Sequence, residues 1–92
     1  MSTNEYARAV EAILDAAGFQ VDWNRVVTRG VRTTYYRGFY GENAVMVTVP
    51  ELIPHTVYIY HCEMHNGREI PGRMLAYIQY TPGSGMAIRW SI

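Results

Sequence analysis

The segment His61-Cys62-Glu63-Met64-His65 gathers residue types that bind metals and act as nucleophiles. If the segment is a strand, adjacent side chains point to opposite faces, so His61 cannot activate the Cys62 thiol. His61 and His65 would share a face but lie about 13 Å apart at ~3.3 Å per residue, too far to bind one ion. His61 and Glu63 could supply two ligands, which is fewer than a zinc site needs. We therefore expect no metal site and no catalytic cysteine, and Cys62 is interpreted as a small, semi-buried apolar residue.

Other signatures of catalysis are missing from the sequence. It contains no glycine-rich phosphate loop, no serine elbow and no obvious pair of carboxylates in a cleft. Pro82-Gly83-Ser84-Gly85 is rich in glycine, but no helix is expected after it, so it is interpreted as a hairpin turn. A small open sheet with one helix also has difficulty enclosing a deep pocket. The sequence thus predicts a protein that is not an enzyme, with no cofactor and no small-molecule substrate.

The stretch from Trp23 to Tyr40 is the most informative part of the chain, because its arginines are interspersed with tyrosines. Guanidinium groups bind phosphates and carboxylates through paired hydrogen bonds, and aromatic rings stack on bases or on guanidinium groups. No spacing typical of a known nucleic-acid-binding motif accompanies them. Three interpretations stay open: a contact patch for a macromolecule, a site for a small anion, or internal pairing with the acidic helix, Glu42 or Glu51. The residues are Arg25, Arg29, Arg32, Tyr35, Tyr36, Arg37 and Tyr40.

Charge is balanced over the whole chain but unevenly distributed along it. The chain has eight arginines, no lysine and eight acidic residues, so its net charge is zero at pH 7. This balance argues against a generally basic nucleic-acid binder. Residues 25–41 nevertheless hold four arginines and no acid. The length of 92 residues predicts one domain, 1–92. A lone Cys62, no signal-peptide pattern and no apolar run of about 20 residues predict a cytoplasmic protein with no membrane partner.

Periodicity predicts an α+β fold that begins with a helix. Apolar residues from Tyr6 to Ala17 recur at helical spacing, and Gly18 supplies a left-handed end, so a helix is expected over 3–17. The turn signal Asn66-Gly67 predicts a type I′ hairpin, and the short connections favour antiparallel pairing. The expected architecture is one N-terminal helix packed on one face of a five- to six-stranded antiparallel meander sheet. A short strand or extended entry is predicted over 19–24, and strands are predicted over 31–40, 44–49, 55–64, 68–81 with an interruption at Pro71-Gly72, and 86–92.

Strand alternation divides the side chains between two faces of this sheet. A single helix covers one face only, so the other is expected to meet solvent, a partner or a second copy. Tyrosine and arginine recur at binding hot spots, although tyrosine is also an ordinary residue of half-exposed strands. The face assigned to the helix holds Val45, Val47, Val49, Val57, Ile59, Ala76, Ile78, Ile88 and Trp90. The second face is assigned Tyr58, Tyr60, Cys62, Leu75, Tyr77, Gln79 and Arg89, together with Arg32, Thr34 and Tyr36.

The chain as a whole resembles the phage-encoded inhibitors of bacterial CRISPR systems, in particular those that act on multi-subunit type I surveillance complexes. The resemblance lies in its length, its helix and small meander, its lack of a catalytic motif, and the aromatic stretches Arg29–Tyr40 and Tyr58–His65. It implies a stoichiometric protein that docks on a ribonucleoprotein complex of the host and blocks binding of target DNA.

In this interpretation the segment Arg25–Tyr40 contacts guide RNA, the path of the DNA or an acidic protein patch, and the tyrosine-bearing face contacts protein. Two alternatives are a stand-alone nucleic-acid-binding module and a homodimer formed through the tyrosine-bearing face. The candidate contact residues are Arg25, Arg29, Arg32, Tyr35, Tyr36, Arg37, Tyr40, Tyr58, Tyr60, Tyr77 and Arg89.

Overall fold

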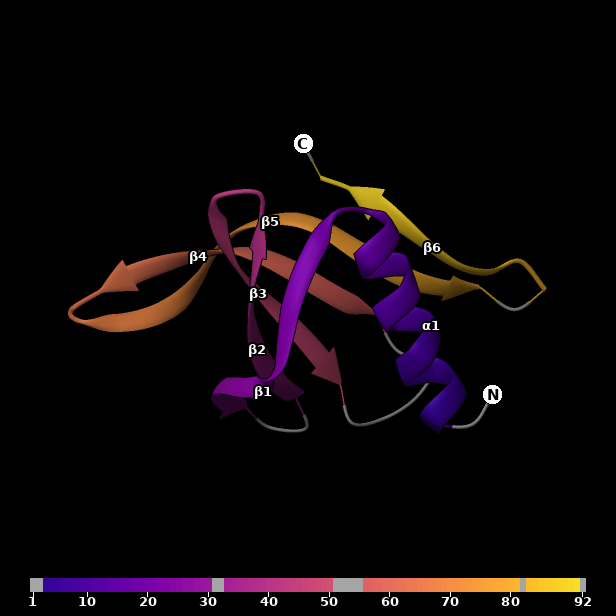
Figure 1. Ribbon diagram of the computed structural model, residues 1–92, viewed down its shortest axis with the longest axis horizontal. Helices are drawn as coiled ribbons and strands as arrows, with labels where there is room; N and C mark the ends of the chain where they lie inside the picture. The colour runs from indigo at the N-terminus through magenta and orange to yellow at the C-terminus, as the bar shows by residue number, and fades with distance from the viewer. Residues whose placement is uncertain (1–2, 31–32, 51–55, 82, 92) are drawn as a thin grey trace.

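The helix and the antiparallel sheet predicted from the sequence are both present. The computed structural model describes residues 3–30, 33–50, 56–81 and 83–91, and Figure 1 shows one N-terminal helix, α1 (Thr3–Ala16), lying against a six-stranded sheet. Each strand pairs antiparallel with the next along the chain, which confirms the α+β meander. The strands are β1 (Phe19–Gly30), β2 (Thr33–Tyr40), β3 (Asn43–Pro50), β4 (Val57–His65), β5 (Arg68–Thr81) and β6 (Gly85–Trp90).

The core lies between α1 and the concave face of the sheet. Tyr6, Val10 and Leu14 form one buried stripe of the helix, as the spacing of four residues requires. Helix α1 contacts β1 and β6, the two edge strands, and the rings of Phe19 and Trp90 stack with centroids 5.5 Å apart. The sheet therefore curls around the helix until its edges approach each other. Of the aliphatic face predicted from the sequence, Val45, Val47, Val57, Ile59, Ala76 and Ile78 are almost fully buried.

The turns follow their sequence signals. Gly18 ends the helix with a φ of 96°, a conformation that glycine adopts without steric cost. Asn66 and Gly67 have φ values of 51° and 77°, and two consecutive positive values identify the predicted type I′ hairpin turn between β4 and β5.

Among the residues described, no helix has the length and apolar character needed to cross a bilayer.

Two strand predictions were wrong in their extent. Strand β1 continues to Gly30 instead of ending at Asn24, and register shifts on either side of Val26 interrupt its pairing. These bulges disrupt the simple alternation that marks a strand. Strand β5 continues through Pro71-Gly72 instead of being interrupted there, although its pairing with β4 shifts register between Pro71 and Met74. Pro71 is tolerated because this part of β5 pairs with β4 alone, while β6 pairs only with Ala76–Thr81, so no ladder hydrogen bond is lost on the other side.

Three residues lie on the helix side of the sheet, although the sequence assigned them to the other face. Leu75 is the extra residue of a bulge, since Ile59 pairs with Ala76 but Tyr60 pairs with Met74, and its side chain joins the core under α1. Thr34 and Tyr36 lie opposite Val49 and Val47 in the register and therefore share their face. Tyr36 accordingly contacts Trp23, with ring centroids 5.1 Å apart. Alternation alone could not orient β2, because its sequence is polar and aromatic on both sides.

Gly38 permits the closest approach between β1 and β2, and this contact can be tested. A Cβ atom there would lie 2.7 Å from the carbonyl oxygen of Gln20 and 3.2 Å from Cα of Val21. Backbone atoms cannot rotate away, so Gly38→Ala should lower the free energy of unfolding by about 1–3 kcal/mol in urea titrations. Gly72→Ala is the matched control. The three atoms nearest to its Cβ would all belong to the side chain of Glu63, which is exposed and can move, so the loss should stay within about 0.5 kcal/mol. Equal losses would show that the close approach is not what Gly38 provides.

Candidate functional site

A single row of side chains crosses all six strands on the outer face, by which we mean the face of the sheet opposite α1. Residues directly opposite each other on neighbouring strands share a face, so the row follows from the register. It contains three of the predicted tyrosines and the predicted Arg89. In strand order from β1 to β6 the row is Thr28, Tyr35, Thr48, Tyr58, Tyr77 and Arg89.

The tyrosines of this face pack against one another. We call Tyr35, Tyr58, Tyr60 and Tyr77 the tyrosine cluster. The ring of Tyr58 lies 6.2 Å from that of Tyr60 and 6.5 Å from that of Tyr77, measured between centroids. Tyr58 is 39% exposed and the other three are half-buried. Burial, and then the proximity of Tyr35 and Tyr58, raise the pKa of the Tyr60 phenol. Tyr60 therefore stays protonated at neutral pH and keeps its hydroxyl as a hydrogen-bond donor.

Thr48 fixes the strand that carries Tyr58. Its side chain is buried between Tyr35 and Tyr58 in the row. The Tyr58 amide donates to Thr48 Oγ1 over 3.1 Å, and Thr48 Oγ1 donates to the Tyr58 carbonyl over 3.2 Å. The cluster thus stands on hydrogen-bonded strands, which reduces the conformational entropy that would be lost when it meets a partner.

Beside the cluster, one carboxylate joins four strands. Arg37 Nε donates to Glu69 Oε2 over 2.5 Å, and Arg25 Nη2 donates to Glu69 Oε1 over 3.1 Å. Cys62 Sγ also donates to Glu69 Oε2, over 3.3 Å. The guanidinium of Arg37 lies over the ring of Phe39, 4.9 Å from its centroid, in the geometry of a cation–π contact. We refer to Arg25, Arg37, Cys62 and Glu69 as the Glu69 network.

The network makes Cys62 a poor nucleophile. Burial, and next the hydrogen bond to Glu69, raise the pKa of the Cys62 thiol, whereas reactive cysteines have lowered values. The side chain is buried, as its interpretation as a semi-buried apolar residue predicted. His61 lies opposite Val45 in the register, on the helix side, away from the thiol. Within the described ranges, no group of three or more His, Cys, Asp or Glu residues is arranged to bind a metal ion.

The structure brings together only some of the predicted contact residues. The tyrosine cluster and Arg89 share the outer face, and Arg25 and Arg37 lie next to them in the Glu69 network. Tyr36 and Tyr40 are on the helix side. Tyr40 packs its ring 4.8 Å from Phe19 and 5.5 Å from Trp90. Arg29 is exposed and lies opposite Thr34, and Arg32 lies outside the described residues.

Internal pairing, one of the three interpretations of the arginines, is correct for Arg25 and Arg37. Their partner among the described residues is Glu69, and Glu51, one of the expected partners, lies outside the described residues. Glu69 is 44 residues from Arg25 and 32 from Arg37 along the chain. The sequence indicates only that Glu69 lies on a predicted strand. Its contact with Arg25 and Arg37 depends on the position of the β4–β5 hairpin against β1 and β2.

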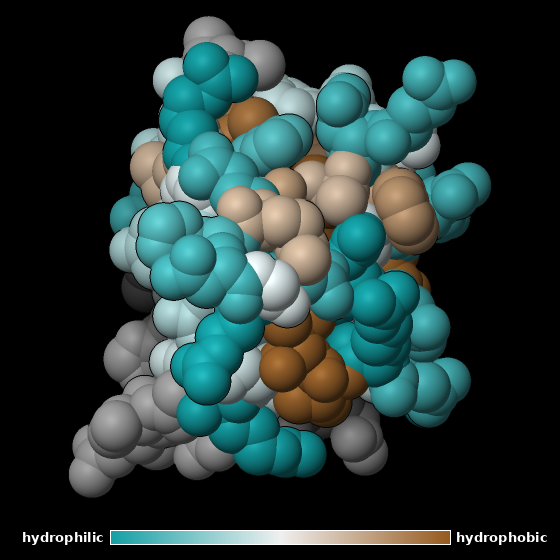
Figure 2. Space-filling view, turned by 90° about the vertical axis from the view of Figure 1, so that its left-hand side faces the viewer, coloured by the Kyte–Doolittle hydropathy of each residue, from teal (hydrophilic) through white to brown (hydrophobic). Residues whose placement is uncertain are grey.

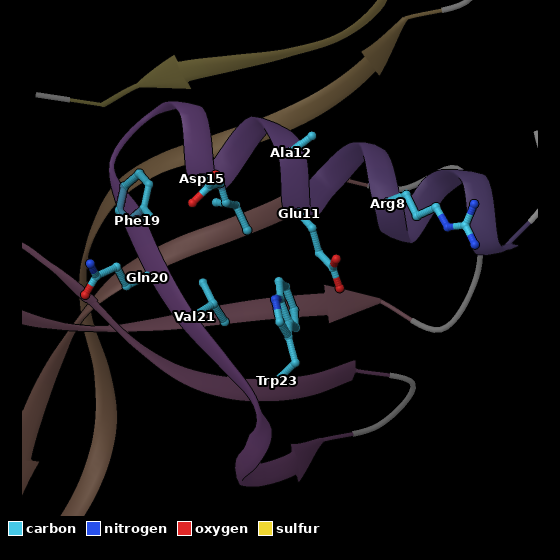
Figure 3. Close-up of a pocket in the computed structure, with 9 residues that line it drawn as sticks. Arg8, Glu11, Ala12, Asp15, Phe19, Gln20, Val21 and Trp23 are labelled. Atoms are coloured by element: carbon cyan, nitrogen blue, oxygen red, sulfur yellow. The ribbon is translucent and has the colours of Figure 1, made fainter.

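A recess lies on the helix side of the sheet, between α1 and β1 (Figure 3). Its volume is about 590 Å³, and Leu14, Phe19 and Val21 form its apolar part. Glu11 of the helix points toward the indole of Trp23, while Arg8 points away along α1. The charged side chains at its rim are exposed, so this recess offers no desolvated group that would select a ligand.

Comparison of the chain with protein-family models, with curated proteins and with solved structures finds no match.

The Glu69 network predicts a specific dependence of stability on pH. The hydrogen bond from Arg37 is the main cause that lowers the pKa of Glu69 from its ordinary 4.5. Because the folded value lies below the unfolded one, the carboxylate stabilises the protein fully above the unfolded pKa and loses this effect as pH falls through the folded value. Glu69→Gln should therefore lower the free energy of unfolding by roughly 1–3 kcal/mol at pH 7. The difference from wild type should shrink toward zero as the pH falls below 4.5.

Urea titrations at pH 7 and in acid measure this difference. Glu42→Gln is the matched control, because Glu42 is exposed in the turn between β2 and β3, and its replacement should change stability little at either pH. A loss in Glu69→Gln that is as large in acid as at pH 7 would contradict an effect of the carboxylate charge.

Proposed function

We propose that this chain is a stoichiometric binding protein that engages a larger protein through the tyrosine cluster and Arg89. The observation that carries the proposal is the contiguous row of aromatic and guanidinium side chains on the one sheet face that α1 leaves uncovered. Tyrosine offers a large flat surface and a directional hydroxyl at low entropic cost. Such residues, fixed on rigid strands, are what binding hot spots are made of.

The chemistry of the face favours binding over turnover. A catalytic acid, base or nucleophile needs a pKa near the working pH. The pKa values of Tyr60 and Cys62 are raised, away from neutrality, and that of Glu69 is lowered. Each shift strengthens the protonation state that the group already has at pH 7. These groups therefore act as fixed hydrogen-bond donors and acceptors.

A protein partner fits this face better than free nucleic acid does. Binding to naked RNA or DNA draws its affinity from arginine and lysine side chains that neutralise phosphates. The net charge of this chain is zero, and two of the arginines from the aromatic stretch already share Glu69. The tyrosine cluster contains no charged residue, and Arg89 is the one charged residue of the row that crosses the six strands.

Following the resemblance noted in the sequence, we propose that the partner is a type I CRISPR surveillance complex in a bacterial cytoplasm, and that the protein blocks its binding of target DNA. Expression of the chain in a bacterium with an active type I system should restore plaque formation by a phage that the system targets. The same host without the CRISPR locus is the control, since plaque numbers there should not change. Unimpaired immunity, with purified complex that still binds target DNA in the presence of excess protein, would rule this partner out.

The docking face can be tested with two tyrosines of matched exposure. Tyr58 on the outer face is 39% exposed and Tyr40 on the helix side is 38% exposed. The double variant Tyr58→Ala/Arg89→Ala should weaken binding at least about tenfold while it stays folded. Tyr40→Ala should keep the affinity and lose thermal stability instead, because its ring packs on Phe19 and Trp90. Calorimetric titration against the complex, or against proteins captured from a bacterial lysate, measures both.

Three outcomes would contradict the docking face. Binding that Tyr40→Ala abolishes and the double variant retains would move the interface to the helix side. Tight binding of naked RNA or DNA that falls steeply with salt would identify a nucleic-acid-binding module. A dimer in light scattering that the double variant dissociates would identify the tyrosine cluster as a contact between two copies.

A further inference from the structure

A groove opens on the outer face where the β4–β5 hairpin leaves the rest of the sheet. Strand β3 pairs with β4 only as far as His61, so beyond that residue the hairpin pairs with itself and projects from the molecule (Figure 1). The groove lies between this hairpin and β1, and its volume is about 660 Å³. Thr28 lines it and is also the first residue of the row that contains Tyr35, Tyr58 and Tyr77. The groove is therefore continuous with the proposed docking face.

Its walls are apolar and remain exposed. Val27 comes from β1, and Met64, Ile70 and Pro71 come from the hairpin. Met64 is 67% exposed and Ile70 is 36% exposed. Figure 2 views the molecule from this end and shows apolar side chains gathered between hydrophilic ones. Burial of these side chains against a partner would gain free energy in proportion to the apolar area covered.

The charges that line the groove are predominantly positive. Among its described lining residues are two arginines, Arg37 and Arg68, and one carboxylate, Glu69. Glu69 also accepts from Arg25, and Arg68 is exposed. Positive charge is therefore in excess within this lining, while Asp22 and Glu63 lie outside it, opposite Arg37 and Ile70 in the register.

The guanidinium groups still have donors to offer. The side chain of Arg25 is 53% exposed and uses one nitrogen for Glu69, out of the five N–H donors of a guanidinium. The Arg37 side chain is 16% exposed. This partial burial weakens the screening of its charge by water, so an incoming anion would be attracted more strongly than at an open surface.

We propose that this groove receives an acidic segment of the partner protein, whose carboxylate pairs with Arg68 and Arg25 while an adjacent apolar side chain packs on Met64, Ile70 and Val27. The inference rests on the proposed function only in that the partner is a protein. A nucleic acid would also bring anions, but the described residues that line the groove include no aromatic ring on which a base could stack. The apolar walls instead match the side chains of an acidic peptide.

Two synthetic peptides test the charge requirement without the partner. One is acetyl-Asp-Leu-Asp-Phe-Asp-Leu-amide, and the other has asparagine in place of each aspartate. In ¹H–¹⁵N NMR titrations the acidic peptide should shift the amide signals of Val27, Thr28 and Gly67, which line the groove. The neutral peptide should bind at least about fivefold more weakly, as expected for the loss of partly desolvated ion pairs.

Variants locate the site. Arg68→Glu should weaken the acidic peptide at least about fivefold, and Met64→Ser should weaken both peptides. The matched control is Arg8→Glu, at the recess between α1 and β1, which should leave the affinity within about twofold. Tyr58→Ala/Arg89→Ala should bind the peptides as wild type does, so failure of the docking face and failure of the groove are distinguishable.

The groove proposal is overturned by any of four results. These are equal affinity for the two peptides, no shift at millimolar peptide, shifts confined to residues outside the groove, and stronger shifts of the same amides by single-stranded hexathymidylate. The last result would assign the groove to a nucleic-acid backbone.

Discussion

A 14-residue helix cannot cover both faces of a six-stranded sheet, and this imbalance governs how the rest of the molecule is built. On the concave face, α1 and the aliphatic side chains of the inner strands exclude water together, and this burial supplies the main stabilisation. Among the described residues, no second layer of secondary structure covers the outer face. This face is stabilised by contacts among its own side chains: Tyr58 packs against Tyr60 on the same strand and against Tyr77 on the next, a guanidinium lies over Phe39, and Met46 is fully buried without a helix above it. Side chains that pack in this way remain partly exposed, and for that reason the same face can serve a partner.

Glu69 explains how the projecting hairpin is kept in position. Beyond His61 the hairpin has lost β3 as a neighbour, so side chains must hold it against β1 and β2. One carboxylate accepts from two arginines and from a thiol, and it can do so because a carboxylate carries about four acceptor sites. The same arrangement leaves positive charge unmatched. The sequence analysis treated internal pairing of the arginines and binding to a partner as alternatives. In this network Arg25 and Arg37 pair with Glu69 and can still donate to a partner.

The sequence was sufficient for the architecture because local signals agree with one another. The helical stripe from Tyr6 to Ala17, the Asn66-Gly67 turn and the aliphatic alternation of β3 and β4 each constrain only a few neighbours, and all were confirmed. The misplaced residues have two causes: Thr34 and Tyr36 lie on β2, whose sequence is polar and aromatic on both sides, and Leu75 lies at an interruption of period two. Leu75 moved to the core through a bulge, and bulges have no reliable sequence signal. The network around Glu69 joins residues 32 and 44 positions apart, and such a contact depends on how far the hairpin bends, which no local pattern encodes. The tyrosine cluster was predictable in part, because β4 and β5 alternate regularly where Tyr58, Tyr60 and Tyr77 lie.

The positions of the tyrosine cluster and the groove suggest different contributions to one interface. The cluster stands on β2, β4 and β5, which are inner strands with neighbours on both sides, so the backbone is fixed before binding. Residues at the centre of an interface are shielded from water by those around them, and aromatic anchors there contribute most of the affinity. The groove lies at the periphery, between an edge strand and a two-stranded hairpin, and the exposed guanidinium group of Arg68 remains accessible to water and salt. Peripheral charges mainly increase association rates and select the orientation of the partner. We therefore expect substitutions in the cluster to act on dissociation, and substitutions of Arg68 to act on association in a manner that depends on ionic strength.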